Sequence, residues 1–92
     1  ASDVYKRQVE GKEIVGFIPL EHKKSEAIIN NYYIKENNAE VLKALLEKVI
    51  DSTDEDKRLS SVTFIEHQRV FQELGFSVEK EWKRYVKMNK EK

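Results

Sequence analysis

The spacing of apolar and polar residues predicts strands in the first third of the chain. The stretch EIVGFIPL, Glu13–Leu20, is rich in β-branched and aromatic residues and is followed by polar residues, which is typical of a strand. Pro19 has no N–H to donate, so we expect an edge position or a bulge there. The next apolar stretch, EAIINNYYI at Glu26–Ile34, predicts a second strand. Its continuous apolar character favours a central position, and the short connection favours antiparallel pairing with the first strand.

The segment NNAEVLKALLEKVID, residues 37–51, predicts the clearest helix. Asn37, followed three residues later by Glu40, resembles a capping box, in which side-chain oxygens satisfy free N–H groups of the first helical turn. The apolar residues of this segment form one broad stripe at helical spacing: Val41, Leu42, Leu45, Leu46, Val49 and Ile50. We therefore expect this helix to bury one face.

The last third of the chain predicts a strand, a short helix and another strand. LSSVTFI at Leu59–Ile65 is strand-like, and HQRVFQEL, residues 67–74, predicts a helix that ends at a left-handed Gly75. FSVEKEWKRYVKM, residues 76–88, predicts one long final strand. The order is β-β-α-β-α-β, and the strands on either side of the long helix are expected to be parallel neighbours joined by a crossover. The fold class is therefore α/β (α+β), with a mixed sheet.

Composition and charge limit the classes of function. The 92 residues suffice for a single domain, and 17 basic residues balance 17 acidic ones, so we expect no nucleic-acid partner. The chain has no cysteine, which excludes disulfides and thiolate chemistry. No apolar run approaches the roughly 20 residues that span a bilayer, so we expect no membrane partner and a cytoplasmic location. His22 and His67 lack neighbours at ligand spacing, and we expect them in a turn and at a helix start rather than in a metal site.

The first eight residues, ASDVYKRQ, predict an artificial origin for the N-terminus. The codons GCG TCA GAT GTG TAT AAG AGA CAG encode Ala1–Gln8 in one continuous frame. This string resembles the adapter and transposon-end DNA that is used to prepare short-read libraries. We therefore interpret residues 1–8 as a non-native segment, as expected for a truncated fragment read from metagenomic DNA, and exclude them from functional assignments. Residues 9–92 then form one domain.

Three stretches of residues 9–88 resemble the GNAT superfamily of N-acetyltransferases. VEGKEIVGFIPL is similar to the hairpin that leads into the third strand of that family. INNYYIKENNAEVLKALLEKVI is similar to its fourth strand, cofactor loop and following helix. VFQELGF and RYVKM are similar to its late helix, the Gly-Phe that ends it, and its final strand. The resemblance implies a partial acyl-CoA N-acyltransferase fold, without the family's first strand, its first two helices and most of its second strand.

The resemblance also implies a site for acetyl-CoA between the fourth and fifth strands of the family. Backbone groups at the end of the fourth strand would pair with the pantetheine arm, and a glycine-rich loop at the next helix N-terminus would hold the pyrophosphate. Here that loop is KENNAEV, residues 35–41, which has no glycine and carries Glu36 and Glu40. The positions that the resemblance assigns to the cofactor are Tyr32, Tyr33, Ile34, Lys35, Asn37, Asn38 and Ala39.

The catalytic positions of the family are less well matched. The Tyr that protonates the departing thiolate in many members corresponds to Phe71, which has no proton to give, and an Asn often found seven residues earlier corresponds to Phe64. Glu26 is the candidate general base, acting through water, and the alternative is a solvated residue at a strand start.

Three hypotheses of function follow from these patterns. The first is the C-terminal portion of an N-acetyltransferase that moves an acetyl group from acetyl-CoA to an unknown amine acceptor in the intact parent. The second is a catalytically degenerate GNAT-like domain for binding or dimerisation. The third is a small nucleic-acid-binding module that uses Lys83, Arg84 and Tyr85. Because most of the family's second strand would be missing, we also expect an exposed sheet edge at Glu13–Leu20 and self-association through it.

Overall fold

The computed structural model describes residues 3–10 and 13–91 of the chain. They form one mixed sheet with the strand order β1-β2-β3-β5-β7-β6, and β4 pairs with β2 beside this path. The strands are β1 (Asp3–Glu10), β2 (Glu13–His22), β3 (Glu26–Ile29), β4 (Tyr33–Ile34), β5 (Arg58–Phe64), β6 (Ser77–Glu81) and β7 (Tyr85–Lys90). The helices are α1 (Ala39–Ser52) and α2 (Gln68–Glu73), each preceded by a single 3₁₀ turn, η1 (Lys35–Asn37) and η2 (Ile65–His67).

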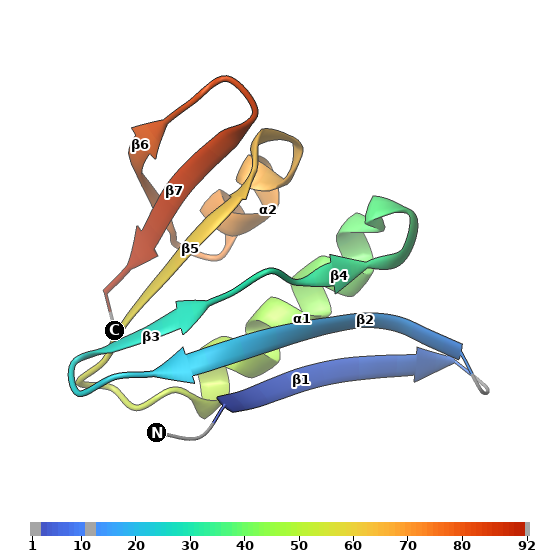
Figure 1. The fold of residues 1–92 in the computed structure, drawn as a ribbon, viewed down its shortest axis with the longest axis horizontal. Helices are drawn as coiled ribbons and strands as arrows, with labels where there is room; N and C mark the ends of the chain where they lie inside the picture. The colour runs from blue at the N-terminus through green and yellow to red at the C-terminus, as the bar shows by residue number, and fades with distance from the viewer. Residues whose placement is uncertain (1–2, 11–12, 92) are drawn as a thin grey trace.

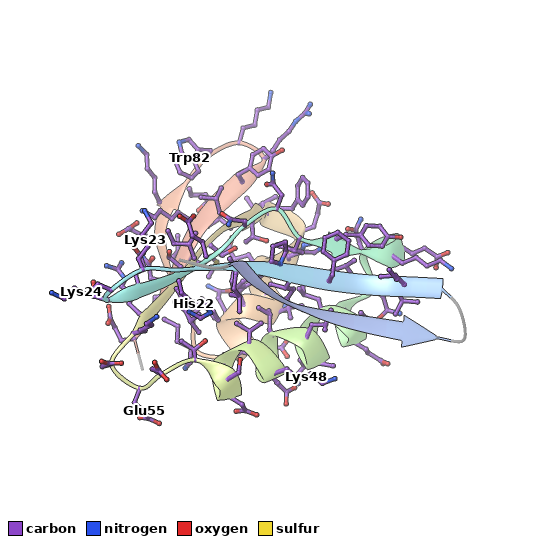
Figure 2. All side chains as sticks on the ribbon, turned by 60° about the horizontal axis from the view of Figure 1, so that its bottom comes forward. His22, Lys23, Lys24, Lys48, Glu55 and Trp82 are labelled. Carbon is purple, nitrogen blue, oxygen red and sulfur yellow. The ribbon has the colours of Figure 1, made fainter. Side chains whose placement is uncertain are left out.

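The topology confirms the predicted mixed sheet. β2 and β3 pair antiparallel, and β3 and β5, which lie on either side of α1 in the sequence, pair in parallel. β5 and β7 are antiparallel. Figures 1 and 2 show both helices on the same side of the sheet. The helices therefore cover one sheet face, and Gly75 follows α2 with a φ of 95°, in the left-handed region as predicted.

The apolar stripe of α1 forms the centre of the core. Leu42, Leu45, Leu46 and Val49 are fully buried, and each buried side chain of this size contributes about 1.5–3 kcal/mol to folding. Gly16 of β2 lies directly beneath the helix, because a Cβ there would come within 3.0 Å of Leu45 Cδ1. A larger residue at this position would push the first turns of α1 away from the sheet. The remaining buried apolar residues are Val15, Ile18, Leu20, Ala27, Ile29, Ile34, Val41, Leu59, Phe71, Phe76, Val86 and Met88.

The prediction of one continuous strand over Glu26–Ile34 is wrong. The segment forms β3 and β4, and the chain leaves the ladder between them at residues 30–32. Pro19 in β2 lies opposite this interruption, and its carbonyl accepts the N–H of Asn30 at 3.1 Å. The N and O of one strand residue point to the same side, so the missing N–H of Pro19 also faces the interruption. Pro19 is therefore tolerated in a strand that has neighbours on both sides, not at the expected edge.

The expected free edge at Glu13–Leu20 is also wrong, because β1 covers it. The β1–β2 ladder runs from the pair Asp3 and Glu21 to the pair Glu10 and Glu13. The residues interpreted as non-native thus provide most of β1. A ladder uses backbone N–H and C=O groups, which almost every residue offers whatever its origin. The origin of residues 1–8 stays a prediction, and so does self-association.

The predicted final strand over residues 76–88 is instead a hairpin of β6 and β7. The turn is closed by the N–H of Trp82, which donates to the carbonyl of Tyr85 at 2.8 Å. Trp82 is 43% exposed, whereas Val86 and Met88 of β7 are fully buried. The turn has no Gly, Asn or Pro to mark it in the sequence.

Candidate functional site

A cleft opens where two parallel strands separate. β3 and β5 pair from Glu26 and Arg58 to Ile29 and Ser61, and the ladder then stops. Beyond that point β4 pairs with β2, while β5 continues to pair with β7. Figure 1 shows β4 and β5 diverging. We call the gap between residues 30–34 and residues 62–64 the strand cleft. It contains a cavity of about 170 Å³ that is lined by Asn31, Tyr32, Val62, Thr63, Phe64 and Tyr85.

The strand cleft is a product of backbone topology. Residues 30–32 lie between two strands, and β4 is paired with β2 on the side away from the cleft. Likewise, Val62 and Thr63 are paired with β7 and have no ladder partner on the β3 side. Strand backbone that lacks a neighbour on one side can bind an extended segment by main-chain hydrogen bonds.

Tyr32 connects the two sides of the strand cleft. Its hydroxyl group hydrogen-bonds to Thr63 Oγ1 in β5 and lies 2.5 Å from Nδ1 of His67 in η2. Its ring packs against the rings of His67 and Phe71, with centroids 5.6 and 6.2 Å away. Burial raises the pKa of the Tyr32 hydroxyl to about 12, so the group is protonated and able to donate a hydrogen bond at neutral pH.

His67 is a buried partner that the sequence patterns did not indicate. It is the last residue of η2, directly before α2, which fits the expected helix start, but its side chain is only 5% exposed. Burial lowers the pKa of His67, opposed by the nearby Glu66 carboxylate. Nε2 of His67 is buried and has no hydrogen-bond partner among the described residues. The contact with Tyr32 spans 35 positions of sequence, so no local pattern could have revealed it.

The two aromatic residues at the positions that the resemblance assigns to catalysis differ in their burial. Phe71 is fully buried, and its ring packs edge-on against Phe76 at 5.0 Å. Phe64 is 43% exposed and stacks on Tyr85 at 5.2 Å. Phe71 therefore contributes packing beneath Tyr32, whereas Phe64 contributes apolar surface to the strand cleft.

Glu26, the candidate general base, lies away from the strand cleft. It is the first residue of β3, in register with Arg58, whereas the cleft begins beyond the last residue of β3. Its Oε1 accepts a hydrogen bond from Ser60 Oγ at 2.7 Å. The structure therefore does not bring Glu26 together with Tyr32 or His67, and its role as a base stays a prediction.

The remaining predicted cofactor positions surround the N-terminus of α1. Tyr33 is exposed, with its ring 5.8 Å from that of Phe17, while Ile34 is buried. Lys35 and Asn38 line a cavity of about 210 Å³ together with Val15, Glu36 and Val41. Ala39 is the first residue of α1 and is exposed.

The helix cap is one residue later than predicted. Asn38, not Asn37, caps α1, and its Oδ1 accepts the N–H groups of Glu40 at 2.9 Å and Val41 at 3.3 Å. Asn37 belongs to η1 instead and has a φ of 52°, next to Glu36 with a φ of 55°. Both residues are thus in the left-handed region, which residues other than glycine rarely adopt. The first turn of α1 is already hydrogen-bonded by a side chain of its own segment.

Two further classes of site are not seen in the described part of the chain. Among the side chains described, those of residues 14–91, no group of three or more His, Asp or Glu is placed to hold a metal ion. None of the helices described is long and apolar enough to cross a membrane.

Comparisons with known proteins identify the fold. No family model matches the chain, and no curated protein matches its sequence. Among solved structures, Escherichia coli ElaA is similar with a TM-score of 0.84 and 16% identity over 99% of this chain and 69% of that chain. An acyl-CoA N-acyltransferase from Pseudomonas aeruginosa has a TM-score of 0.80 and 11% identity, over 98% of this chain and 69% of that one.

A third similar structure is the Campylobacter jejuni N-acetyltransferase PseH in complex with acetyl coenzyme A. Its TM-score is 0.73 and its identity 17%, over 100% of this chain and 70% of that one. Such low identities establish the fold alone. The chain has the GNAT acyl-CoA N-acyltransferase fold.

Proposed function

We propose that this chain is the C-terminal, donor-binding portion of a GNAT-type N-acetyltransferase, which in the intact parent transfers an acetyl group from acetyl-CoA to an amine. The strand cleft carries this proposal. It combines a gap between diverging strands with backbone that has a strand neighbour on one side only. PseH, which shares the fold, has been solved with acetyl coenzyme A.

The strand cleft suits the thioester arm of such a donor. An extended arm can add to the backbone of residues 32–34 as a further strand would, because this kind of recognition uses main-chain groups and places few demands on side chains. Val62 and Phe64 offer apolar contact from the opposite side. The Tyr32 hydroxyl, with its raised pKa, stays protonated beneath the arm.

Neither Phe71 nor Glu26 is placed to transfer a proton in the strand cleft. Phe71 has no ionisable group and is fully buried, so it cannot protonate the leaving thiolate. Glu26 lies at the far end of β3 from the strand cleft. We therefore place the general base and the site of the amine acceptor outside the strand cleft.

A catalytically degenerate binding domain is the second candidate. The buried Phe71 and the side-chain cap on α1 favour it, because both replace groups that the resemblance assigns to catalysis or to the cofactor. A degenerate domain would have no reason to keep affinity for an acyl thioester. Donor binding therefore separates the two candidates.

The test is calorimetric titration of acetyl-CoA into the 92-residue chain. We expect a dissociation constant below about 1 mM. Val62→Trp, which fills the strand cleft from an exposed position, should weaken binding by about tenfold or more. Val78→Trp in β6 makes the same change at another exposed position and should leave binding unchanged. A flat titration for the unsubstituted chain would exclude the transferase proposal in favour of the degenerate domain.

A further inference from the structure

A CoA thioester has two recognisable parts, and the structure suits only one of them. The thioester arm is neutral and extended, and the strand cleft can take it through backbone groups. The nucleotide diphosphate is strongly anionic and needs donors or positive charge. In this fold region, the nearest N–H donors that point along a helix axis are those of the first turn of α1.

Three of these donors, the N–H groups of Glu40, Val41 and Leu42, are already used within the chain. Asn38 Oδ1 accepts the N–H groups of both Glu40 and Val41, and the N–H of Leu42 donates to the Asn38 carbonyl. A phosphate oxygen at this position would have to displace the Asn38 side chain. A helix N-terminus binds anions only when its amides are available, so this cap removes the usual advantage of the position.

The charges around the cap also oppose an anion. Glu36 lies two residues before Asn38, and Glu40 lies two residues after it, so two exposed carboxylates flank the first turn. Lys35 supplies one positive charge in the same segment. A diphosphate placed here would meet a net negative environment. The two carboxylates would repel it, and they already interact with the positive end of the helix dipole that would otherwise attract it.

The backbone before the cap is shaped by side chains as well. Glu36 and Asn37 have φ values of 55° and 52°, the conformation that glycine adopts without cost. Both residues carry a Cβ where glycine would let a phosphate approach the backbone closely.

We infer that this chain recognises its donor through the pantetheine thioester arm and gains nothing from the nucleotide diphosphate. The inference rests on the proposed function, and it names the donor class of the same site. Pantetheine thioesters that lack the nucleotide are then donors as good as acetyl-CoA.

Two titrations of the 92-residue chain test this inference, one with acetyl-CoA and one with S-acetylpantetheine. We expect the two dissociation constants to agree within about fivefold. A larger ratio in favour of acetyl-CoA overturns the inference and leaves the proposed function intact. If neither compound binds, the proposed function itself fails. If only S-acetylpantetheine binds, acetyl-CoA is not the donor and the proposed function fails, although the thioester arm is still recognised without the nucleotide.

A double variant tests whether the Asn38 cap and the Glu36 carboxylate are the reason that the diphosphate adds no affinity. Asn38→Gly removes the side chain that occupies the amides while keeping an acceptable cap, and Glu36→Gln removes one carboxylate. Together they should strengthen acetyl-CoA binding by about tenfold and leave S-acetylpantetheine binding unchanged. Glu47→Gln, an equal charge change at an exposed site in the middle of α1, should alter neither. An unchanged acetyl-CoA affinity in the double variant would overturn the inference, because the cap and its charge would then not exclude the diphosphate.

Discussion

The strand cleft and the N-terminus of α1 are adjacent parts of one segment, yet they differ in what maintains them. The strand cleft exists because β4 and β5 take different neighbours, which is a property of the backbone topology. The α1 N-terminus depends on single side chains, and Asn38 fills it. A feature made by topology tolerates sequence change, whereas a site made of glycines and available amides can be closed by one residue. The following predictions test this contrast, from the largest expected effect to the smallest.

Removal of the packing beneath the strand cleft should have the largest effect. Phe71→Ala deletes a fully buried ring that contacts Tyr32 and Phe76, so we expect a loss of about 3–5 kcal/mol in the free energy of unfolding. Phe64→Ala, on the exposed side of the cleft, should cost about 1 kcal/mol through its stacking on Tyr85. Chemical denaturation measures both. Similar losses for the two variants would mean that both sides of the cleft are equally well packed, which would contradict the structure.

Ionisation of Tyr32 at high pH should cause the next largest loss in the free energy of unfolding. The pKa of its hydroxyl is about 12 in the folded chain, against the ordinary value of 10.0 when unfolded. Between these values the unfolded chain loses the proton and the folded chain keeps it, so stability is full below pH 10 and falls as the pH rises towards 12. The expected loss from this group is roughly 3 kcal/mol.

Tyr32→Phe is the matched control for this pH dependence. The variant keeps the ring and its packing on Phe71 but has no proton to lose at this position. The difference between the two unfolding curves, measured from pH 9 to 12, isolates the contribution of Tyr32 from those of the lysines and other tyrosines. Parallel curves would show that the Tyr32 hydroxyl is solvated rather than buried in the cleft.

The cap on α1 should contribute a smaller amount to the free energy of unfolding. Asn38→Ala leaves the N–H groups of Glu40 and Val41 without their side-chain acceptor, and we expect a loss of about 1 kcal/mol. Asn38→Asp retains an acceptor oxygen and should stay within about 0.5 kcal/mol of the unsubstituted chain. Thermal unfolding followed by circular dichroism is sufficient. If alanine and aspartate behave alike, the amides do not depend on Asn38 and are available to a ligand.

The smallest effect is expected in the turn before the cap, where a substitution should increase the free energy of unfolding. Glu36 has a φ of 55°, so Glu36→Gly should relieve strain and stabilise the chain by about 0.5–1 kcal/mol. Glu40→Gly, four residues later and inside α1, should destabilise it by about 1 kcal/mol. Opposite signs in the same unfolding assay support the left-handed turn. A loss for both variants would contradict it.

Much of the fold follows from local pattern alone. The stripe of α1 was predicted because the helical period reports which face is buried. The left-handed Gly75 was predicted because such a glycine commonly ends a helix, and the parallel pairing of β3 with β5 because a helix connects the two strands. The likeness of three stretches to the GNAT superfamily also predicted the fold that the solved structures share. Burial of a face is encoded within about ten residues, so a single sequence carries it.

The tertiary structure alone decided where strands end and which distant side chains meet. The interruption at residues 30–32 arises because β2 pairs with β3 and β4 in turn around Pro19, and the β6–β7 turn closes without a turn-forming residue. The contact of Tyr32 with His67 joins residues 35 positions apart. Strand ends and such contacts depend on the neighbour that each segment finds in space, and the neighbour's position is set by the whole sheet. The sequence by itself therefore determined the elements and their buried faces, and tertiary packing determined the cleft.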